Sequence, residues 1–176
     1  MTRYAIVLTL ATLLGLTACS KPANPGNAET VQPANNAVKR VGSTDVVKAE
    51  PEAVEIAPGG SGEATIRLTI QKGYHVNANP PTYPYLIPTQ LEVAPKDGLS
   101  IGQISYPAPI TIKLAFAEKP LAVYEGQTAI KATMKADSSV QVGERTIPAK
   151  LRIQACDDQV CFPPGSIELA IPVRVK

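Results

Sequence analysis

The stretch AKLRIQAC, from Ala149 to Cys156, alternates apolar and polar side chains along its whole length. Successive side chains of an extended chain point to opposite faces, so the apolar set lies on one face and the polar set on the other. The stretch therefore predicts a β-strand with one face on a core and one face in water. Cys156 falls on the non-core face, where we expect it to be an exposed strand end.

The same period of two recurs along the chain, at residues 64–71 and 167–176. Turn signals separate the segments, and no long stretch has a helical period. Seven to nine short strands in about 130 residues predict an all-β fold, an immunoglobulin-like antiparallel β-sandwich. Pro172 lacks an N–H group, so the last strand is expected at an edge or paired on one side only there. The weaker strand candidates are Val46–Ile56, Tyr74–Asn77, Gln90–Val93, Ile101–Tyr106, Ile112–Phe116 and Thr128–Lys135.

Composition narrows the class of protein. The chain has 176 residues, which suits one domain, and its 17 prolines with 18% charged residues favour a loop-rich β fold over a helical bundle. A net charge of +2 gives no indication of a nucleic-acid partner. With three cysteines and one histidine, we predict neither a metal site nor a cofactor.

The first twenty residues indicate export. Arg3 precedes the apolar run from Ala5 to Leu16, which is too short to span a bilayer. The run ends in Leu16-Thr17-Ala18-Cys19, which resembles the lipobox of bacterial lipoproteins. The resemblance implies that residues 1–18 are a signal peptide and that Cys19 carries the lipid anchor; an ordinary signal peptide is the alternative. Ser20 after the cysteine, rather than Asp, points to the outer membrane, with the domain facing the periplasm of the bacterial cell envelope.

Residues 20–44 are rich in Pro, Asn, Ala and Gly and contain no aromatic residue. Such a segment buries too little apolar surface to offset the entropy of ordering it. We therefore assign residues 19–44 to the acylated cysteine and a flexible tether, and residues 45–176 to the folded domain.

Cys156 and Cys161 are close enough in sequence to form a disulfide in an exported protein. As a structural staple it would contribute only about 2 kcal/mol, because the loop that it closes is short. An accessible disulfide of this kind is also suited to redox exchange. Asp157 and Asp158 should disfavour a thiolate on Cys156 by like-charge repulsion.

The segment QACDDQVCFPP, from Gln154 to Pro164, closely resembles the cysteine loop of the N-terminal periplasmic domain of the thiol:disulfide interchange protein DsbD. The resemblance extends over about residues 45–176. Its further matches are Gly73-Tyr74-His75-Val76-Asn77, Asn79-Pro80-Pro81, Ile87-Pro88-Thr89, Tyr106-Pro107 and Val123-Tyr124-Glu125-Gly126.

The resemblance implies an immunoglobulin-like domain that exchanges reducing equivalents with thioredoxin-like or other periplasmic disulfide proteins. It assigns Cys161 as the attacking thiol and Cys156 as the resolving thiol. A cap loop covers the cysteines in the family, and its counterpart here is expected between Tyr106 and Pro120, with Phe116 as the shield. The other expected neighbours of the site are His75, Asn77, Asp157, Asp158 and Phe162.

Two departures keep alternatives open. Here four residues separate the cysteines, whereas the family's best-known member has five. Full-length DsbD continues into a membrane domain and a thioredoxin-like domain, whereas this sequence stops at Lys176, so we expect a membrane electron donor in a separate chain. The rival hypothesis is a non-catalytic binding or assembly lipoprotein with a structural disulfide.

Two further features have more than one interpretation. His75 is the single histidine of the sequence. A lone histidine usually has no role beyond packing or surface exposure; the alternatives for His75 are a metal ligand and a proton shuttle. The proline-rich run from Pro80 to Pro88 predicts either a stiff connection or a polyproline segment that binds a partner.

Overall fold

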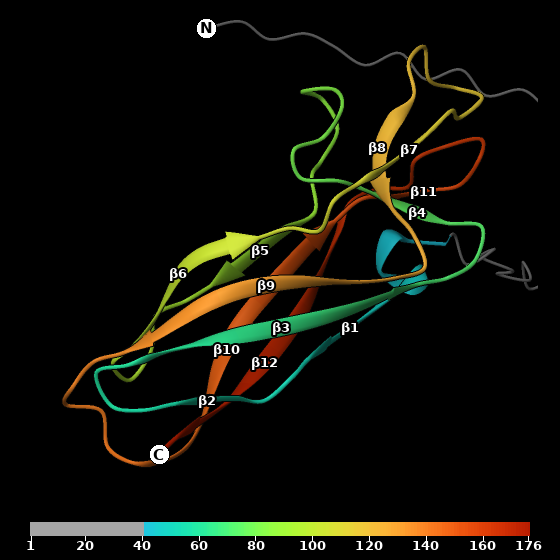
Figure 1. Cartoon of the computed structure of the whole chain (residues 1–176). Coiled ribbons are helices and arrows are strands. Elements are labelled where there is room, and N and C mark those ends of the chain that lie inside the picture. The colour runs from blue at the N-terminus through green and yellow to red at the C-terminus, as the bar shows by residue number, and fades with distance from the viewer. Residues whose placement is uncertain (1–40) are drawn as a thin grey trace, which may run out of the picture. The chain divides into compact units, whose positions relative to one another are not determined.

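The computed structural model describes residues 41–176 (Figure 1). The predicted signal peptide, Cys19 and the tether up to residue 40 lie outside the described residues. Within residues 41–176 the regular structure is almost entirely β, and the helical part is one 3₁₀ turn, η1 (Ser43–Val46). No helix in this part of the chain is long and apolar enough to cross a membrane.

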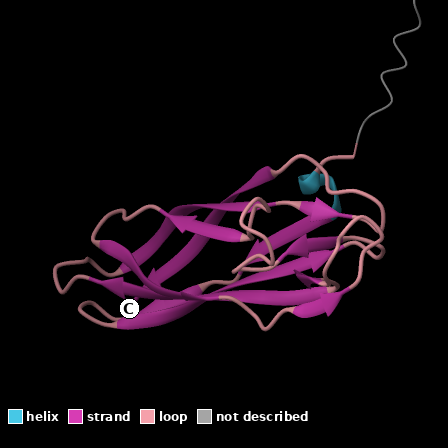
Figure 2. Cartoon of the chain, turned by 90° about the horizontal axis from the view of Figure 1, so that it is seen from above, coloured by secondary structure: helices cyan, strands magenta, loops and turns pink. Residues whose placement is uncertain are grey.

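Two four-stranded sheets form the body of the domain (Figures 1 and 2). The first has the order β1-β3-β9-β6 and is antiparallel throughout; the second has the order β2-β12-β10-β5, in which β2 joins β12 in parallel. This arrangement confirms the predicted immunoglobulin-like β-sandwich. The strands of the first sheet are β1 (Val47–Pro51), β3 (Ser61–Ile70), β9 (Gln127–Ala136) and β6 (Leu99–Ser105), and those of the second are β2 (Val54–Ile56), β12 (Gly165–Val175), β10 (Gly143–Ile153) and β5 (Gln90–Val93).

A third, smaller sheet lies at one end of the sandwich, at the upper right of Figure 1. Its order is β11-β4-β8-β7, and all of its pairings are antiparallel. Its first strand follows β10 after a single intervening residue, Gln154, so the long strand of the body leads directly into the end sheet. The strands are β11 (Ala155–Cys156), β4 (His75–Asn77), β8 (Leu121–Tyr124) and β7 (Ile110–Ile112).

Apolar side chains gather in two clusters of very different size. The larger fills the body, where Ile66, Leu68 and Leu151 are fully buried by the alternation that the sequence predicts. The smaller lies at the end sheet and consists of Leu86, Leu114, Ala117, Leu121, Val123 and Cys156.

The strand expected at Ile112–Phe116 is wrong. Only Ile112 belongs to a strand, the end of β7, because the chain then turns and buries Leu114 in the smaller cluster. The segment expected at Val46–Ile56 forms two strands that belong to different sheets. Pro172 pairs with β10 only, since the parallel pairing with β2 begins at Val173, so the expected one-sided pairing is confirmed, although β12 is not an edge strand.

Candidate functional site

A disulfide joins Cys156 and Cys161, with the two Cα atoms 3.9 Å apart. The turn between them is closed by Asp157, whose backbone N–H donates to the carbonyl of Val160 at 3.0 Å. The Asp157 carboxylate accepts the backbone N–H groups of Gln159 and Val160, both at 2.8 Å. This carboxylate, which the sequence indicates only as a charge near Cys156, therefore also fixes the turn that presents Cys161.

The two sulfur-bearing residues differ in exposure. Cys156 is 1% exposed and packs in the smaller apolar cluster, whereas Cys161 is half-buried at the surface of that cluster. Cys156 does lie on the face away from the main core, as the alternation predicts, but the expectation that it is exposed is wrong. The reason is that β11 leaves the main sheet, and other segments, contributing residues such as Leu114 and Leu121, cover its second face.

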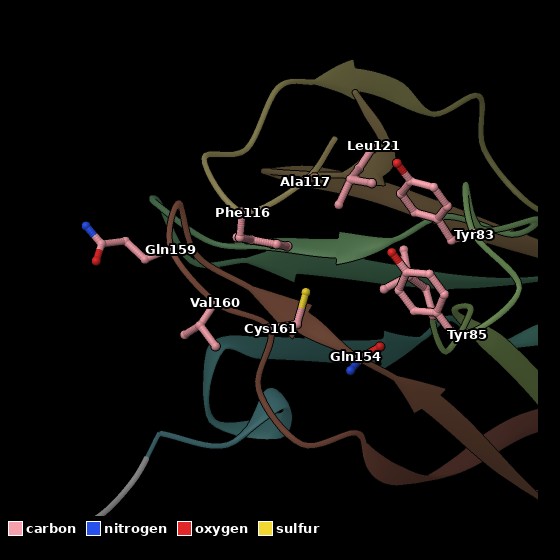
Figure 3. Close-up of a pocket in the computed structure, with 10 residues that line it drawn as sticks. Tyr83, Tyr85, Phe116, Ala117, Leu121, Gln154, Gln159, Val160 and Cys161 are labelled. Atoms are coloured by element: carbon pink, nitrogen blue, oxygen red, sulfur yellow. The ribbon is translucent and has the colours of Figure 1, made fainter. Parts of the chain in front are cut away.

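A cavity of about 340 Å³ opens beside Cys161 (Figure 3). The sulfur of Cys161 points into the space between Phe116 and the two tyrosines Tyr83 and Tyr85 (Figure 3). Three of the cavity-lining side chains are large, apolar and well exposed: Tyr85 at 72%, Val160 at 51% and Phe116 at 43%. The accessible cysteine thus lies within an apolar, solvent-facing hollow.

The segment expected to form the cap, residues 106–120, does reach the cysteines. Phe116 and Ala117 line the cavity, and Lys113 donates from Nζ to the carbonyls of Ala117 and Glu118, which holds the turn of the segment. Ala115 N lies 3.4 Å from the carbonyl oxygen of Asp158, in the cysteine turn itself. The structure therefore brings Phe116 beside Cys161.

The proline-rich run from Pro80 to Pro88 forms the opposite wall. The rings of Tyr83 and Tyr85 stack with centroids 5.1 Å apart, and both side chains line the cavity. The Tyr83 hydroxyl accepts the backbone N–H of Lys119 at 3.0 Å, which ties this wall to the end of the cap segment. The run is thus both a connection and a wall of the cavity.

Gln154 organises the floor of the site. Its Oε1 accepts hydrogen bonds from Asn77 Nδ2 and from Ile87 N, both at 3.0 Å, and its Nε2 donates to the carbonyl of Phe162 at 3.3 Å. One side chain therefore links β4, the proline-rich wall and the cysteine loop. Its role is not predicted from the sequence; the available signal is its position on the non-core face, two residues before Cys156.

Ser43 is a second organising residue that is not predicted from the sequence, because it lies within residues 19–44, the predicted tether. Its side chain is buried, accepts the backbone N–H of Ala155 at 2.9 Å and donates to the carbonyl of Pro163 at 2.7 Å. It thereby joins β11 to the far end of the cysteine loop.

The remaining predicted neighbours lie around the disulfide. His75 and Asn77 are buried on β4, and His75 pairs directly with Cys156 across the strands. Phe162 packs against Tyr74, with ring centroids 5.9 Å apart, and Asp158 is exposed. Within residues 41–176, no cluster of three His, Cys, Asp or Glu side chains is placed to hold a metal ion.

The sequence matches the profile of a known protein family. The profile of the family described as "Thiol:disulfide interchange protein DsbD, N-terminal" matches residues 43–171. No curated protein matches the sequence.

Among solved structures, the N-terminal periplasmic domain of ScsB from Proteus mirabilis is similar in fold, with a TM-score of 0.54 and 13% identity over 72% of this chain. The chain spans 46% of that protein's length. A family 123 glycoside hydrolase from Clostridium perfringens (10% identity, 74% of this chain and 27% of that one) and the pilin BcpA from Bacillus cereus (13%, 73% and 39%) match with TM-scores of 0.32.

Proposed function

We propose that this chain, which belongs to the family of the N-terminal domain of the thiol:disulfide interchange protein DsbD, exchanges disulfides with partner proteins through Cys156 and Cys161. The observation that carries the proposal is the placement of the disulfide: it joins a buried sulfur to one that faces an open apolar cavity. A disulfide that serves only stability needs no such access, whereas exchange requires that one sulfur be reached by a thiol.

The unequal burial supports an assignment of roles. Cys161 is the thiol that attacks a partner's disulfide, because the partner's sulfur can approach it through the cavity. Cys156 then attacks Cys161 and releases the partner in reduced form. Burial disfavours the charged thiolate of Cys156, which suits a residue that reacts only after a mixed disulfide has formed next to it.

The partners are thioredoxin-like or other periplasmic disulfide proteins, and the electrons come from a membrane protein in a separate chain. The apolar side chains around the cavity support a protein partner, since exposed aromatic side chains of this size are typical of interaction surfaces. Phe116 is the shield over Cys161 in the absence of a partner.

The test combines trapping of a mixed disulfide in cells with a redox titration of the purified protein. In cells that produce the Cys156→Ala variant, Cys161 should accumulate as a mixed disulfide with its partner, and the variant that lacks both cysteines is the matched control. The purified wild type should be reduced at a potential near those of periplasmic carriers. A potential below about −300 mV together with no adduct would establish the structural staple instead.

We further propose that the domain is anchored by lipid at Cys19 and faces the periplasm from the outer membrane. The support is the lipobox-like sequence before Cys19 and the absence of Asp after it. Labelling with a radioactive fatty acid should mark the wild type and not Cys19→Ala. An unlabelled, soluble wild type would contradict the anchor without affecting the exchange proposal.

A further inference from the structure

Three chemically active side chains lie in one row across the end sheet. Cys156 on β11 pairs directly with His75 on β4, and Glu125 follows the last residue of β8. Directly opposed residues of antiparallel strands have Cβ atoms about 5 Å apart and side chains on the same face. The adjacent positions along the strands, Val76 on β4 and Tyr124 on β8, belong to the main core, so the row lies on the opposite face of the sheet, with the cysteines.

The imidazole of His75 is largely buried and lies next to the carboxylate of Glu125. Its side chain is 11% exposed, and its Nε2 lies 3.3 Å from the Oε2 of Glu125. A carboxylate oxygen this close favours the tautomer with its proton on Nε2, and the neutral form of that tautomer carries its lone pair on Nδ1. That Nδ1 atom is buried and has no hydrogen-bond partner while the disulfide is intact.

A buried acceptor without a hydrogen-bond partner lowers the stability of the fold. Reduction of the disulfide offers it a partner, because it creates an S–H donor on Cys156, the residue directly opposite His75. It also creates a need for a base, since a buried thiol loses its proton with difficulty.

We propose that His75 is the proton acceptor for Cys156 during the resolving step, and that Glu125 is a positioning residue that fixes the imidazole with its Nδ1 lone pair free. This inference rests on the exchange function proposed above. It adds to that function a base for the second, intramolecular step.

In the mixed disulfide, Cys161 is bonded to a partner sulfur and Cys156 is a thiol. The Cys156 proton passes to Nδ1 of His75, the Cys156 sulfur bonds to the Cys161 sulfur, and the bond to the partner breaks. The partner leaves as a thiolate and takes up a proton from the solvent, and the His75 imidazolium gives its extra proton back to the solvent. The pair of cysteines is thereby oxidised by two electrons, and the partner's disulfide is reduced to a dithiol.

Three titratable residues adjacent to the row, Asp157, Tyr124 and Tyr74, have contacts of their own. The Asp157 carboxylate, next to Cys156, accepts two backbone N–H groups in its own turn. Tyr124 directly precedes Glu125, and burial raises the pKa of its phenol, so it stays neutral; its hydroxyl accepts the N–H of Asn79. Tyr74, which precedes His75, packs its ring against Phe162.

The two chemical steps can be separated with Ellman's reagent. When the reduced, full-length chain is mixed with one equivalent of reagent, attack by Cys161 releases the first chromophore, and resolution by Cys156 releases the second. The Cys156→Ala variant defines the first phase alone. A defect in the first phase would count against the proposed function, whereas the second phase tests His75.

We expect His75→Phe to slow the second phase roughly 100-fold at pH 7, the usual effect of losing a general base, with the first phase within about twofold of wild type. The deficit should shrink as the pH rises, because hydroxide replaces the missing base. Glu125→Gln should slow the second phase about tenfold, and Glu168→Gln, an exposed carboxylate of the body, should have no effect.

A merely structural role for His75 would alter both phases, without this dependence on pH. A second phase unchanged at pH 7 in folded His75→Phe would overturn the proposal. If that variant does not fold, His75→Gln and Glu125→Gln provide the same comparison.

An independent measurement needs no substitution. His75 is the only histidine in the sequence, so ¹⁵N spectra of histidine-labelled protein report this ring alone. The oxidised protein should show the Nε2-protonated tautomer, and reduction should shift the Nδ1 resonance as the new thiol hydrogen bond forms. Identical ring spectra in the two redox states would contradict the proposal.

Discussion

The body of the sandwich and its cysteine end are stabilised in different ways. In the body, β10 and β12 pair continuously from Gly143–Val175 to Ile153–Gly165, and the apolar faces of both sheets are buried in one large cluster. In the end sheet, β11 has two residues, and the chain is held by side chains such as Gln154 and Ser43 that bond to backbone groups. Stability is therefore concentrated in one region and chemistry in the other, and substitutions should separate them.

The largest expected effect is on the body. Leu151 is fully buried between the sheets, so Leu151→Ala removes apolar contacts and leaves a cavity. We expect a loss of about 2–5 kcal/mol in the free energy of unfolding, measured by urea denaturation. The folded fraction should retain the wild-type rate with Ellman's reagent, and a variant that loses that rate while folded would break the separation of the two regions.

The next effect concerns the disulfide itself. Replacing both Cys156 and Cys161 with Ala should leave the domain folded at 25 °C, because neither cysteine belongs to the large apolar cluster that fills the body. The short loop predicts a loss of about 2 kcal/mol, or a fall in Tm of roughly 5–10 °C. Circular dichroism during heating measures it, and a variant that is unfolded at 25 °C would support the structural staple.

The same contrast explains what could be predicted from the sequence. Alternation predicts the body well, because each side chain's face follows from its position in a long strand: Ala149, Leu151 and Ile153 are all buried, as expected. The rule fails at the end sheet, where β11 has two residues and its second face is covered by segments distant in sequence. The burial of Cys156 therefore results from tertiary packing, which the alternation of apolar and polar residues does not predict.

The organising polar residues of the site were harder still to predict. Ser43 belongs to a stretch whose composition resembles the tether, and nothing local indicates its bonds to Ala155 and Pro163. In the sequence, Glu125 stands out only as part of the family motif Val123-Tyr124-Glu125-Gly126, because its closeness to His75 arises from the pairing of β4 with β8. The resemblance to a family did place Phe116 and the cysteines near one another.

A smaller effect should separate the two sulfurs. Burial disfavours a charged thiolate, and Cys156 is 1% exposed whereas Cys161 is only half-buried. With a thioredoxin-like partner between pH 6 and 9, the Cys156→Ala variant should therefore form adducts through Cys161 in about tenfold higher yield than Cys161→Ala forms through Cys156. Equal or reversed yields would mean that the attacking role belongs to the other sulfur.

The smallest expected effect tests whether Phe116 is a shield or part of a docking surface. Phe116 is 43% exposed and lines the cavity of Cys161, so Phe116→Ala should cost only about 1 kcal/mol of stability. As a shield, its removal should raise the rate at which a small thiol such as dithiothreitol reduces the disulfide by roughly threefold, because exchange depends on access.

A protein partner distinguishes the two roles of Phe116. If the ring only shields Cys161, the reaction with a thioredoxin-like protein should accelerate along with the reaction with dithiothreitol. If the ring also contacts the partner, the small reagent should react faster while the protein reacts more slowly, since a docking side chain has been lost. Val142→Ala is the matched control, because Val142 is an exposed apolar residue of the body, 71% accessible, that does not line the cavity. A Phe116→Ala variant that matches this control with both reagents would assign the covering of Cys161 to the stacked tyrosines on the opposite wall.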